Sequence, residues 1–312
     1  MSRERFLKLA KNAWLVLFVL ASLFFVFDYF QQQSARLVGP LRISIPYLIL
    51  AVVLQAAMWT NAAWCWGKII WLTAGVRLPL LVGVSHLALT TLGKYFPGKV
   101  WGMAARAALM KQQGVLIEQS LLATFHEQLI FLHAAVVLSC LMIALLFKTE
   151  WAWAVGALGL LSVPVGMLGQ KYLVRLSRHL ASRFSVEKQP TSWRDITHKN
   201  YLVLLLAYLA VWLWSGLSFA CIYQAFFETH TGAELIFALL LANAAGNTLG
   251  FLALFAPGGI GVREVVASAI LAGFIPLNDA IMLNLLYRLC VVAFELLGSL
   301  TLLLPGSRSF KA

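Results

Sequence analysis

The sequence predicts an all-α polytopic membrane protein built from two inverted-topology repeats, each with a Pro-Gly-tipped re-entrant helical hairpin. The first observation is composition: of the 312 residues, 61% are hydrophobic and 12% are charged, whereas about a quarter of the residues of a soluble domain are charged. The second is a set of apolar runs long enough to cross a bilayer as helices. The third is a pair of apolar segments interrupted by Pro-Gly motifs at matching positions of the two halves.

Six apolar runs are long enough to be complete membrane crossings, since about 20 helical residues span the hydrocarbon core. We interpret all of them as helices, because no alternation typical of barrel strands appears and open backbone cannot face lipid. The first run follows a charged segment that resembles the start of a signal peptide, but it lacks a small-x-small cleavage site, so we expect a retained helix. The runs cover residues 13–30, 43–66, 119–147, 151–169, 201–227 and 280–304.

The apolar segment 78–111 is broken in the middle by "LGKYFPGKVWG". The pieces on either side, residues 78–92 and 100–110, would be roughly 22 and 16 Å long at about 1.5 Å per residue. Both are too short to span the ~30 Å core of a bilayer. The sequence therefore predicts a re-entrant hairpin with Pro97 and Gly98 at its tip.

The segment 233–275 is broken in the same way by "LFAPGGIGVREVV", and Pro257 and Gly258 occupy the position of the tip. Here the first piece, residues 233–256, is long enough to span the bilayer by itself. A full crossing is therefore the alternative to a second re-entrant hairpin.

Both halves of the chain follow the order helix, helix, hairpin, helix. Lys and Arg concentrate before the first run, in the 170–199 segment and after the last run, and such residues mark cytoplasmic segments. With both termini in the cytoplasm, the two halves begin on opposite sides of the membrane. We expect a single membrane domain, residues 1–312, with repeat one at about 13–147, a basic cytoplasmic loop at 170–199 and repeat two at about 151–304.

The two hairpin tips have the chemistry of an anion site. Proline interrupts each helix and glycine permits a tight turn. The helix that restarts presents unpaired N–H groups and the positive end of its dipole, which favour a phosphate. Because cations inside a membrane are costly and usually face a polar cavity, we predict that nearby cations also bind substrate. The predicted substrate-binding residues are Lys94, Lys99, Arg106, Gly258, Gly259, Gly261, Arg263 and Arg288.

Several of these residues have a structural alternative. Arg263 with Glu264, or Arg288 with Glu295, could form ion pairs that only fix helix packing. Asn243 and Asn247 are typical of hydrogen bonds between membrane helices. Four acidic or histidine side chains are candidate proton carriers: His126, Glu127, Glu264 and Glu295.

The sequence predicts no metal site and no catalytic residue. His126 and His133 share a helix face, but no third ligand is defined. The four cysteines lie inside or at the edge of apolar runs without a CxxC pair, so we expect core thiols. Most of the eleven tryptophans lie near the ends of predicted spans, and we interpret them as interfacial anchors. Trp101 is the exception, because it follows the first hairpin tip.

At "LGKYFPGKVWG" and "FAPGGIGVRE" the chain resembles the lysylphosphatidylglycerol synthase transmembrane-region family, a flippase-like membrane domain. The resemblance implies a multi-pass protein of the bacterial inner (plasma) membrane that moves an anionic, aminoacylated or glycosylated lipid between leaflets. We expect a stand-alone member without the soluble aminoacyl-transferase domain, since no residues follow Ala312. The matching positions are Lys94, Pro97, Gly98 and Lys99 in the first motif and Pro257, Gly258, Gly259, Gly261, Arg263 and Glu264 in the second.

We therefore expect translocation, of the flippase or scramblase type, of an anionic lipid or a polyprenyl-phosphate-linked glycolipid, with no enzyme activity and no cofactor. The expected partners are that anionic phospholipid or polyprenyl-phosphate lipid, the membrane, and a lipid-modifying enzyme. Nucleic acid is not expected, because the basic residues flank membrane helices and no nucleic-acid-binding motif accompanies them.

Two alternatives remain from the sequence. One is a membrane-embedded glycosyl- or aminoacyl-lipid transferase, for which Asp28 is the one candidate base and no DxD motif exists. The other is an accessory subunit of a lipid-synthesis complex.

Overall fold

The structure is a computed structural model that describes residues 43–93, 101–184, 196–227, 232–253, 256 and 259–303. The chain divides into two compact units, Met1–Ile43 and Ser44–Ala312. Only Ile43 of the first unit is described, so the fold below is that of the second. The predicted first helix, residues 13–30, lies outside the described residues.

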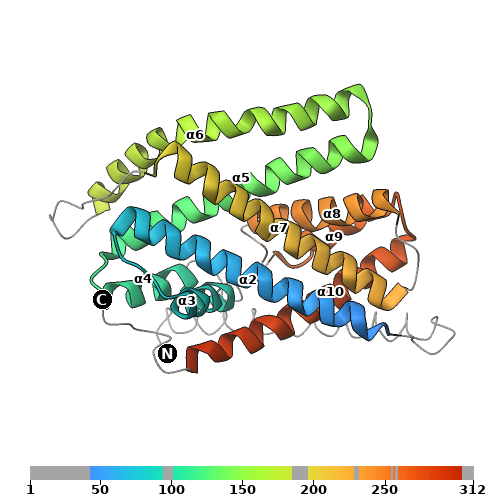
Figure 1. Cartoon of the computed structure of the whole chain (residues 1–312), viewed down its shortest axis with the longest axis horizontal. Helices are drawn as coiled ribbons and strands as arrows, with labels where there is room; N and C mark the ends of the chain where they lie inside the picture. The colour runs from blue at the N-terminus through green and yellow to red at the C-terminus, as the bar shows by residue number, and fades with distance from the viewer. Residues whose placement is uncertain are drawn as a thin grey trace, which may run out of the picture. The chain divides into compact units, whose positions relative to one another are not determined.

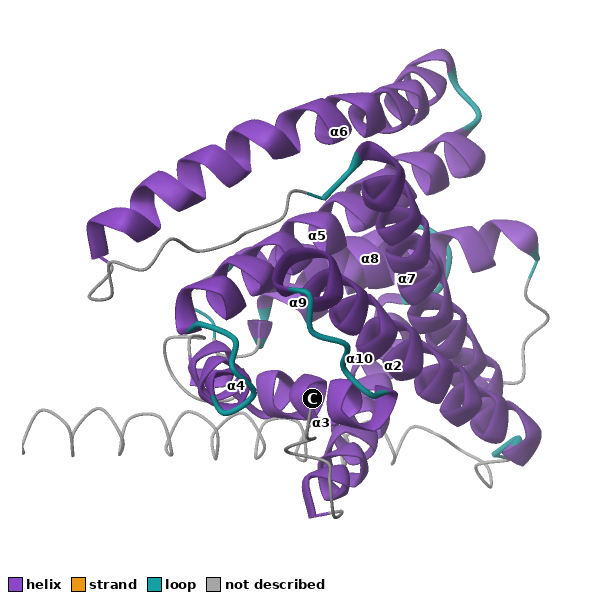
Figure 2. Ribbon diagram, turned by 60° about the vertical axis from the view of Figure 1, so that its left-hand side comes forward, coloured by secondary structure: helices purple, strands orange, loops and turns teal. Residues whose placement is uncertain are grey.

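Every regular element in the described ranges is helical, as Figure 2 shows. This confirms the all-α prediction for that part of the chain. The elements in order are α2 (Ile45–Ala74), α3 (Leu80–Gly93), α4 (Trp101–Lys111), α5 (Ile117–Phe147), α6 (Glu150–Phe184), α7 (His198–Phe227), α8 (Ala233–Leu252), α9 (Val262–Leu271), α10 (Leu277–Ser299) and the 3-10 turn η2 (Leu300–Leu303).

Six helices of the described ranges are long and apolar enough to cross a membrane by length and composition. Five of them correspond to predicted runs, and the sixth is the first arm of the second broken segment. The candidate spans are Ile45–Ala74, Ile117–Phe147, Glu150–Gln170, His198–Phe227, Ala233–Leu252 and Leu277–Leu302.

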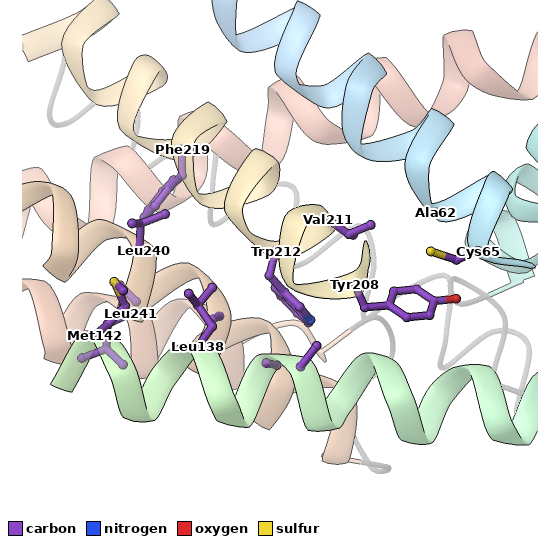
Figure 3. Packing of buried hydrophobic residues seen from close by; sticks show 14 of the residues in the cluster. Ala62, Cys65, Leu138, Met142, Tyr208, Val211, Trp212, Phe219, Leu240 and Leu241 are labelled. Atoms are coloured by element: carbon purple, nitrogen blue, oxygen red, sulfur yellow. The ribbon is translucent and has the colours of Figure 1, made fainter. Parts of the chain in front are cut away.

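Helices α2 and α7 pack side by side along much of their length (Figure 1). Helix α5 packs against both of them and also against α4, α6 and α8. Large side chains of α7 pack against the neighbouring helices. For example, Phe219 lies beside Leu240 of α8 in Figure 3. Gly216 permits this close packing, because a Cβ there would overlap the Leu240 side chain.

Helix α6 is longer than the predicted run 151–169, because it continues to Phe184. Residues 170–184 of the segment expected to be a loop are therefore helical. The extension is rich in Leu and Arg, which are good helix formers, and no proline follows Pro164 until Pro190.

The two broken segments form two helical hairpins whose arms meet at glycines. In the first, a Cβ at Gly93 would overlap the Gly102 backbone, and one at Gly102 would lie 2.6 Å from Thr90 Cα. In the second, a Cβ at Gly250 would lie 3.0 Å from Arg263 Cβ. Only glycine allows the α3–α4 backbones to approach so closely.

The tips themselves, residues 94–100 and 257–258, lie outside the described residues. Helix α8 ends at Leu252, four residues before the predicted end of its apolar piece. Gly259 and Gly261 follow with φ values of 72° and 86°. This left-handed backbone is open to glycine without strain, and it turns the chain into α9.

The close contact at Gly102 generates a prediction. Gly102→Ala places a methyl group against the α3 backbone, which cannot move aside as a side chain could, so we expect destabilisation of about 1–3 kcal/mol. The measurement is the thermal unfolding midpoint of the purified protein in detergent. The matched control is Gly67→Ala in α2, because a Cβ at Gly67 would have its nearest neighbour, the Leu78 carbonyl oxygen, at 3.7 Å. Equal midpoints for the two variants would contradict the described α3–α4 contact.

Candidate functional site

A buried ion pair joins the first hairpin to helix α5. Arg106 of α4 is 1% exposed, and its Nη1 donates to Oε2 of Glu127, which is also buried. The Arg106 guanidinium lies over the Trp66 ring, with 3.8 Å between Cζ and the ring centroid. Burial removes water from the Arg106 charge, which is costly. The ion pair and the cation–π contact compensate for this lost hydration.

Side chains from three further helices surround this pair. Tyr208 of α7 donates its hydroxyl proton to Glu127 Oε1 at 3.4 Å. The Trp66 indole of α2 donates to Nδ1 of His86 of α3 at 3.3 Å. Five helices therefore converge on one charged cluster, which we call the first cluster: Trp66, His86, Arg106, Glu127 and Tyr208.

A second ion pair joins the second hairpin to α10. Arg288 Nη1 donates to Glu264 Oε1 at 2.6 Å, and the other carboxylate oxygen accepts from the Gly261 N–H at 2.8 Å. Glu264 thus caps the N-terminus of α9, where a negative charge is favoured by the unpaired N–H groups and the dipole. The carboxylate occupies the place that the sequence predicts for a bound anion.

Arg263 lies next to the Glu264–Arg288 pair but forms no ion pair with Glu264. Its Cζ is 5.6 Å from the centroid of the Tyr287 ring. Within the described residues, no carboxylate lies within 4.0 Å of its guanidinium nitrogens, and the ion pair of the site is instead between Glu264 and Arg288. We call Gly261, Arg263, Glu264, Tyr287 and Arg288 the second cluster.

The ion pairs expected from the sequence are therefore corrected. Arg263 does not pair with its neighbour Glu264, and Arg288 pairs across helices with Glu264. Glu295 is buried on α10 and makes other interactions. Adjacent residues on a helix point about 100° apart, which explains why the sequence neighbours Arg263 and Glu264 face different groups.

A neutral polar network lies behind the second cluster. The Tyr287 hydroxyl accepts from Gln55 Nε2 at 3.0 Å and donates to the Ser215 carbonyl at 3.1 Å. Asn243 of α8 donates to Ser215 Oγ at 3.0 Å, and Asn247 donates to Asn243 Oδ1 at 2.9 Å. The network ties α2, α7, α8 and α10 together, as expected for polar side chains between membrane helices.

The structure brings six of the twelve predicted site residues into these two clusters. Arg106 and Glu127 meet in the first, and Gly261, Arg263, Glu264 and Arg288 meet in the second, with Gly259 at the turn before it. His126 is buried on α5, and its Nδ1 lies 2.9 Å from the Leu122 carbonyl oxygen. Lys94, Lys99 and Gly258 lie outside the described residues.

Sequence reasoning misses the aromatic members of both clusters. The sequence groups Trp66 with the interfacial anchors, as it does most other tryptophans, but Trp59, Trp66 and Trp212 are buried. The position of Trp66 near the end of its predicted run makes it resemble an anchor, whereas α2 continues to Ala74. Tyr287 could be found from its place directly before Arg288.

The described residues provide no set of ligands for a metal ion. Within the ranges that the structure describes, no group of three or more His, Cys, Asp or Glu side chains could hold a metal ion.

The first cluster allows a stability test. Arg106→Leu and Glu127→Leu each leave one buried charge without its partner, so we expect each to lose about 3–5 kcal/mol of stability. The double variant removes both charges and should be markedly more stable than either single variant. Thermal unfolding of the four proteins in detergent measures this coupling. Additive losses in the double variant would show that the two side chains act independently.

Comparison with known proteins adds the family. The model of the lysylphosphatidylglycerol synthase TM region matches residues 13–298, which include both hairpins and both clusters. No curated protein matches the chain. Because the family match covers most of the chain and six helices of the described ranges are long and apolar enough to span a membrane, this is a multi-pass membrane protein that belongs to the lysylphosphatidylglycerol synthase TM region family.

Proposed function

We propose that the protein translocates an anionic lipid between the leaflets of a bacterial inner membrane, as a flippase or scramblase-like transporter. The lipid is an anionic phospholipid or a polyprenyl-phosphate-linked glycolipid. The observation that carries this proposal is Arg263, a guanidinium beside the N-terminus of α9 for which the described residues supply no carboxylate within 4.0 Å. A cation in such a place favours an anionic ligand.

The second cluster supports the proposal because its hydrogen-bond donors already bind a carboxylate, that of Glu264. The Glu264 carboxylate lies between the Gly261 N–H and Arg288, and a phosphate can accept from both groups in the same way. A headgroup phosphate would compete with Glu264 for these donors, with Arg263 adding a second positive charge. Glu264 would then be free to take up a proton. This is the role that the sequence suggests for Glu264, as it does for His126, Glu127 and Glu295.

The helix contacts support two repeats, about 13–147 and 151–304. Exchanging α2, α3, α4 and α5 for α7, α8, α9 and α10 converts every packed pair among these helices into another packed pair. The pairs α3–α4 and α8–α9 exchange, as do α4–α5 with α9–α10 and α3–α10 with α5–α8. Inverted repeats of this kind hold substrate between their two halves, and each hairpin is then re-entrant.

The same exchange relates the two ion pairs. Arg106–Glu127 joins α4 to α5, and Glu264–Arg288 joins α9 to α10. Their exposure differs: the side chains of the first pair are 1% and 6% exposed, and those of the second are 18% and 17% exposed. We propose that the second cluster is the accessible one in this conformation, and that rearrangement of the two halves exchanges their exposure while acyl chains stay in the lipid. Translocation is passive or ion-coupled, and both termini are cytoplasmic.

The test is leaflet exchange in reconstituted liposomes. Fluorescent phosphatidylglycerol and a polyprenyl-phosphate analogue are followed with wild type and Arg263→Ala. A charge-assisted hydrogen bond contributes about 1.5–3 kcal/mol, so its loss should slow exchange roughly 10- to 100-fold. Wild-type exchange no faster than in empty liposomes, or equal rates in the two proteins, would contradict the proposal.

A matched control is the exposed pair between Lys148 and Glu234, whose Nζ and Oε1 lie 3.1 Å apart and whose side chains are 61% and 64% exposed. Lys148→Ala also removes one cation from an ion pair, but at the surface. We expect its exchange rate to equal that of wild type, because exposed pairs contribute little.

Competition by Glu264 gives a second prediction. In Glu264→Gln the amide oxygen can still cap α9, but the negative charge that neutralises Arg288 is gone. Phosphatidylglycerol should then bind more tightly, by roughly tenfold if about 1.4 kcal/mol of competition is removed. Native mass spectrometry of the purified protein measures lipid retention, with Glu234→Gln as the control. Unchanged or weaker retention in Glu264→Gln would show that the headgroup does not use this position.

A further inference from the structure

A cavity of about 350 Å³ lies between α5, α6 and α7, apart from both ion pairs. Its polar lining consists of His126, His133, Ser162, Gln170 and Tyr201, and its apolar lining includes Val165. Among the described residues, those that line it include no Asp, Glu, Lys or Arg. Among the described side chains, a ligand in the cavity therefore meets uncharged or histidine hydrogen-bonding groups.

Part of this lining is already ordered by hydrogen bonds. Ser162 donates its hydroxyl proton to the Gly159 carbonyl at 2.6 Å, so its oxygen accepts from His133 Nε2 at 2.8 Å. His133 Nδ1 then accepts from the Tyr201 hydroxyl at 2.7 Å. The arrangement satisfies all three side chains with a neutral histidine, and it fixes the wall of the cavity.

Gln170 is the exception on the same wall. It is 4% exposed, and neither its Nε2 nor its Oε1 has a hydrogen-bond partner in the described structure. Buried polar groups in proteins are nearly always hydrogen-bonded, so an unsatisfied amide calls for a missing partner. An amide offers a donor and an acceptor side by side, and a hydroxyl group can satisfy both.

The cavity is also accessible from the outer face of α6. It is not enclosed, and Val165 in its lining is 68% exposed. Leu158, Leu161 and Leu168 of the same helix are also exposed, as expected for a helix face toward lipid. A ligand that enters here brings an apolar chain past Val165. Its polar group reaches the Gln170 amide, whose Nε2 and Oε1 are buried, when that side chain turns toward the cavity.

We propose that this cavity binds the uncharged, hydroxyl-bearing headgroup of a lipid, such as a sugar or a glycerol group, with Gln170 as its main hydrogen-bonding partner. The neutral lining separates this site from the clusters proposed to hold an anion. The inference stands on the cavity and does not depend on the proposed function.

The experiment is native mass spectrometry of the full chain purified in a zwitterionic detergent. The probe is glucosyl diacylglycerol, compared with phosphatidylcholine of the same acyl chains and with free glucose. Wild type should retain the glucosyl lipid in preference to both comparators. Gln170→Leu should retain it about tenfold less, because an amide that bonds the hydroxyls is lost.

Two further variants separate binding from folding. Val165→Trp fills the entrance and should also reduce retention, whereas Leu161→Trp places the same side chain on the lipid-facing part of α6 and should not. Without added lipid, Gln170→Leu should melt at a higher temperature than wild type, because it removes an unsatisfied buried amide.

Three outcomes would overturn the proposal. Equal retention of the glucosyl lipid by wild type and Gln170→Leu would remove Gln170 from the site. Equal retention of phosphatidylcholine would show that the hydroxyl groups are not recognised. Binding of free glucose as tight as that of the lipid would overturn the assignment to a lipid headgroup.

Discussion

The structure depends on one constraint: a polar group surrounded by hydrocarbon must find its partner within the protein. Breaking a helix frees backbone groups and brings charged residues into the interior, so the broken segments are costly to build. In the second hairpin, the Glu264 carboxylate supplies a partner for the Gly261 N–H and for Arg288 at once. In the first, Glu127 and the Trp66 ring neutralise Arg106. Each broken segment is thus stabilised by the helix that follows it.

Small residues are the second requirement of this arrangement. The hairpin arms approach at Gly93 and Gly102 in the first half and at Gly246 and Gly250 in the second. The second arm of each hairpin then carries one member of an ion pair to the following helix: Arg106 to Glu127 and Glu264 to Arg288. The glycines therefore hold the two arms of each hairpin together, and the ion pairs join each hairpin to the helix that follows.

The sequence predicts the spans well because hydropathy is a local property, and it locates the two hairpins because a Pro-Gly motif breaks each of these apolar segments. It could not predict the ion pairs. Glu264 and Arg288 are 24 residues apart, and only the packing of α9 against α10 decides that Arg288 faces Glu264 and not Glu295. The role of Trp66 is hidden for a related reason, since a tryptophan at a span end suits an interface and a buried cation equally well. Gln170 belongs to a segment that the sequence predicts to be a loop, where no cavity would be sought.

Helix α5 connects the charged and the neutral parts of the molecule. Glu127 faces Arg106 in the first cluster, while its neighbour His126 lines the cavity against α6, because successive helical residues point about 100° apart. Any rotation or shift of α5 that changes the exposure of the Arg106–Glu127 pair must also change the shape of the cavity. If the two halves rearrange during translocation, a lipid held beside Gln170 would bias that movement, since a ligand favours whichever conformation binds it more tightly. The neutral cavity thus shares α5 with the first cluster, although its described lining contains neither ion pair.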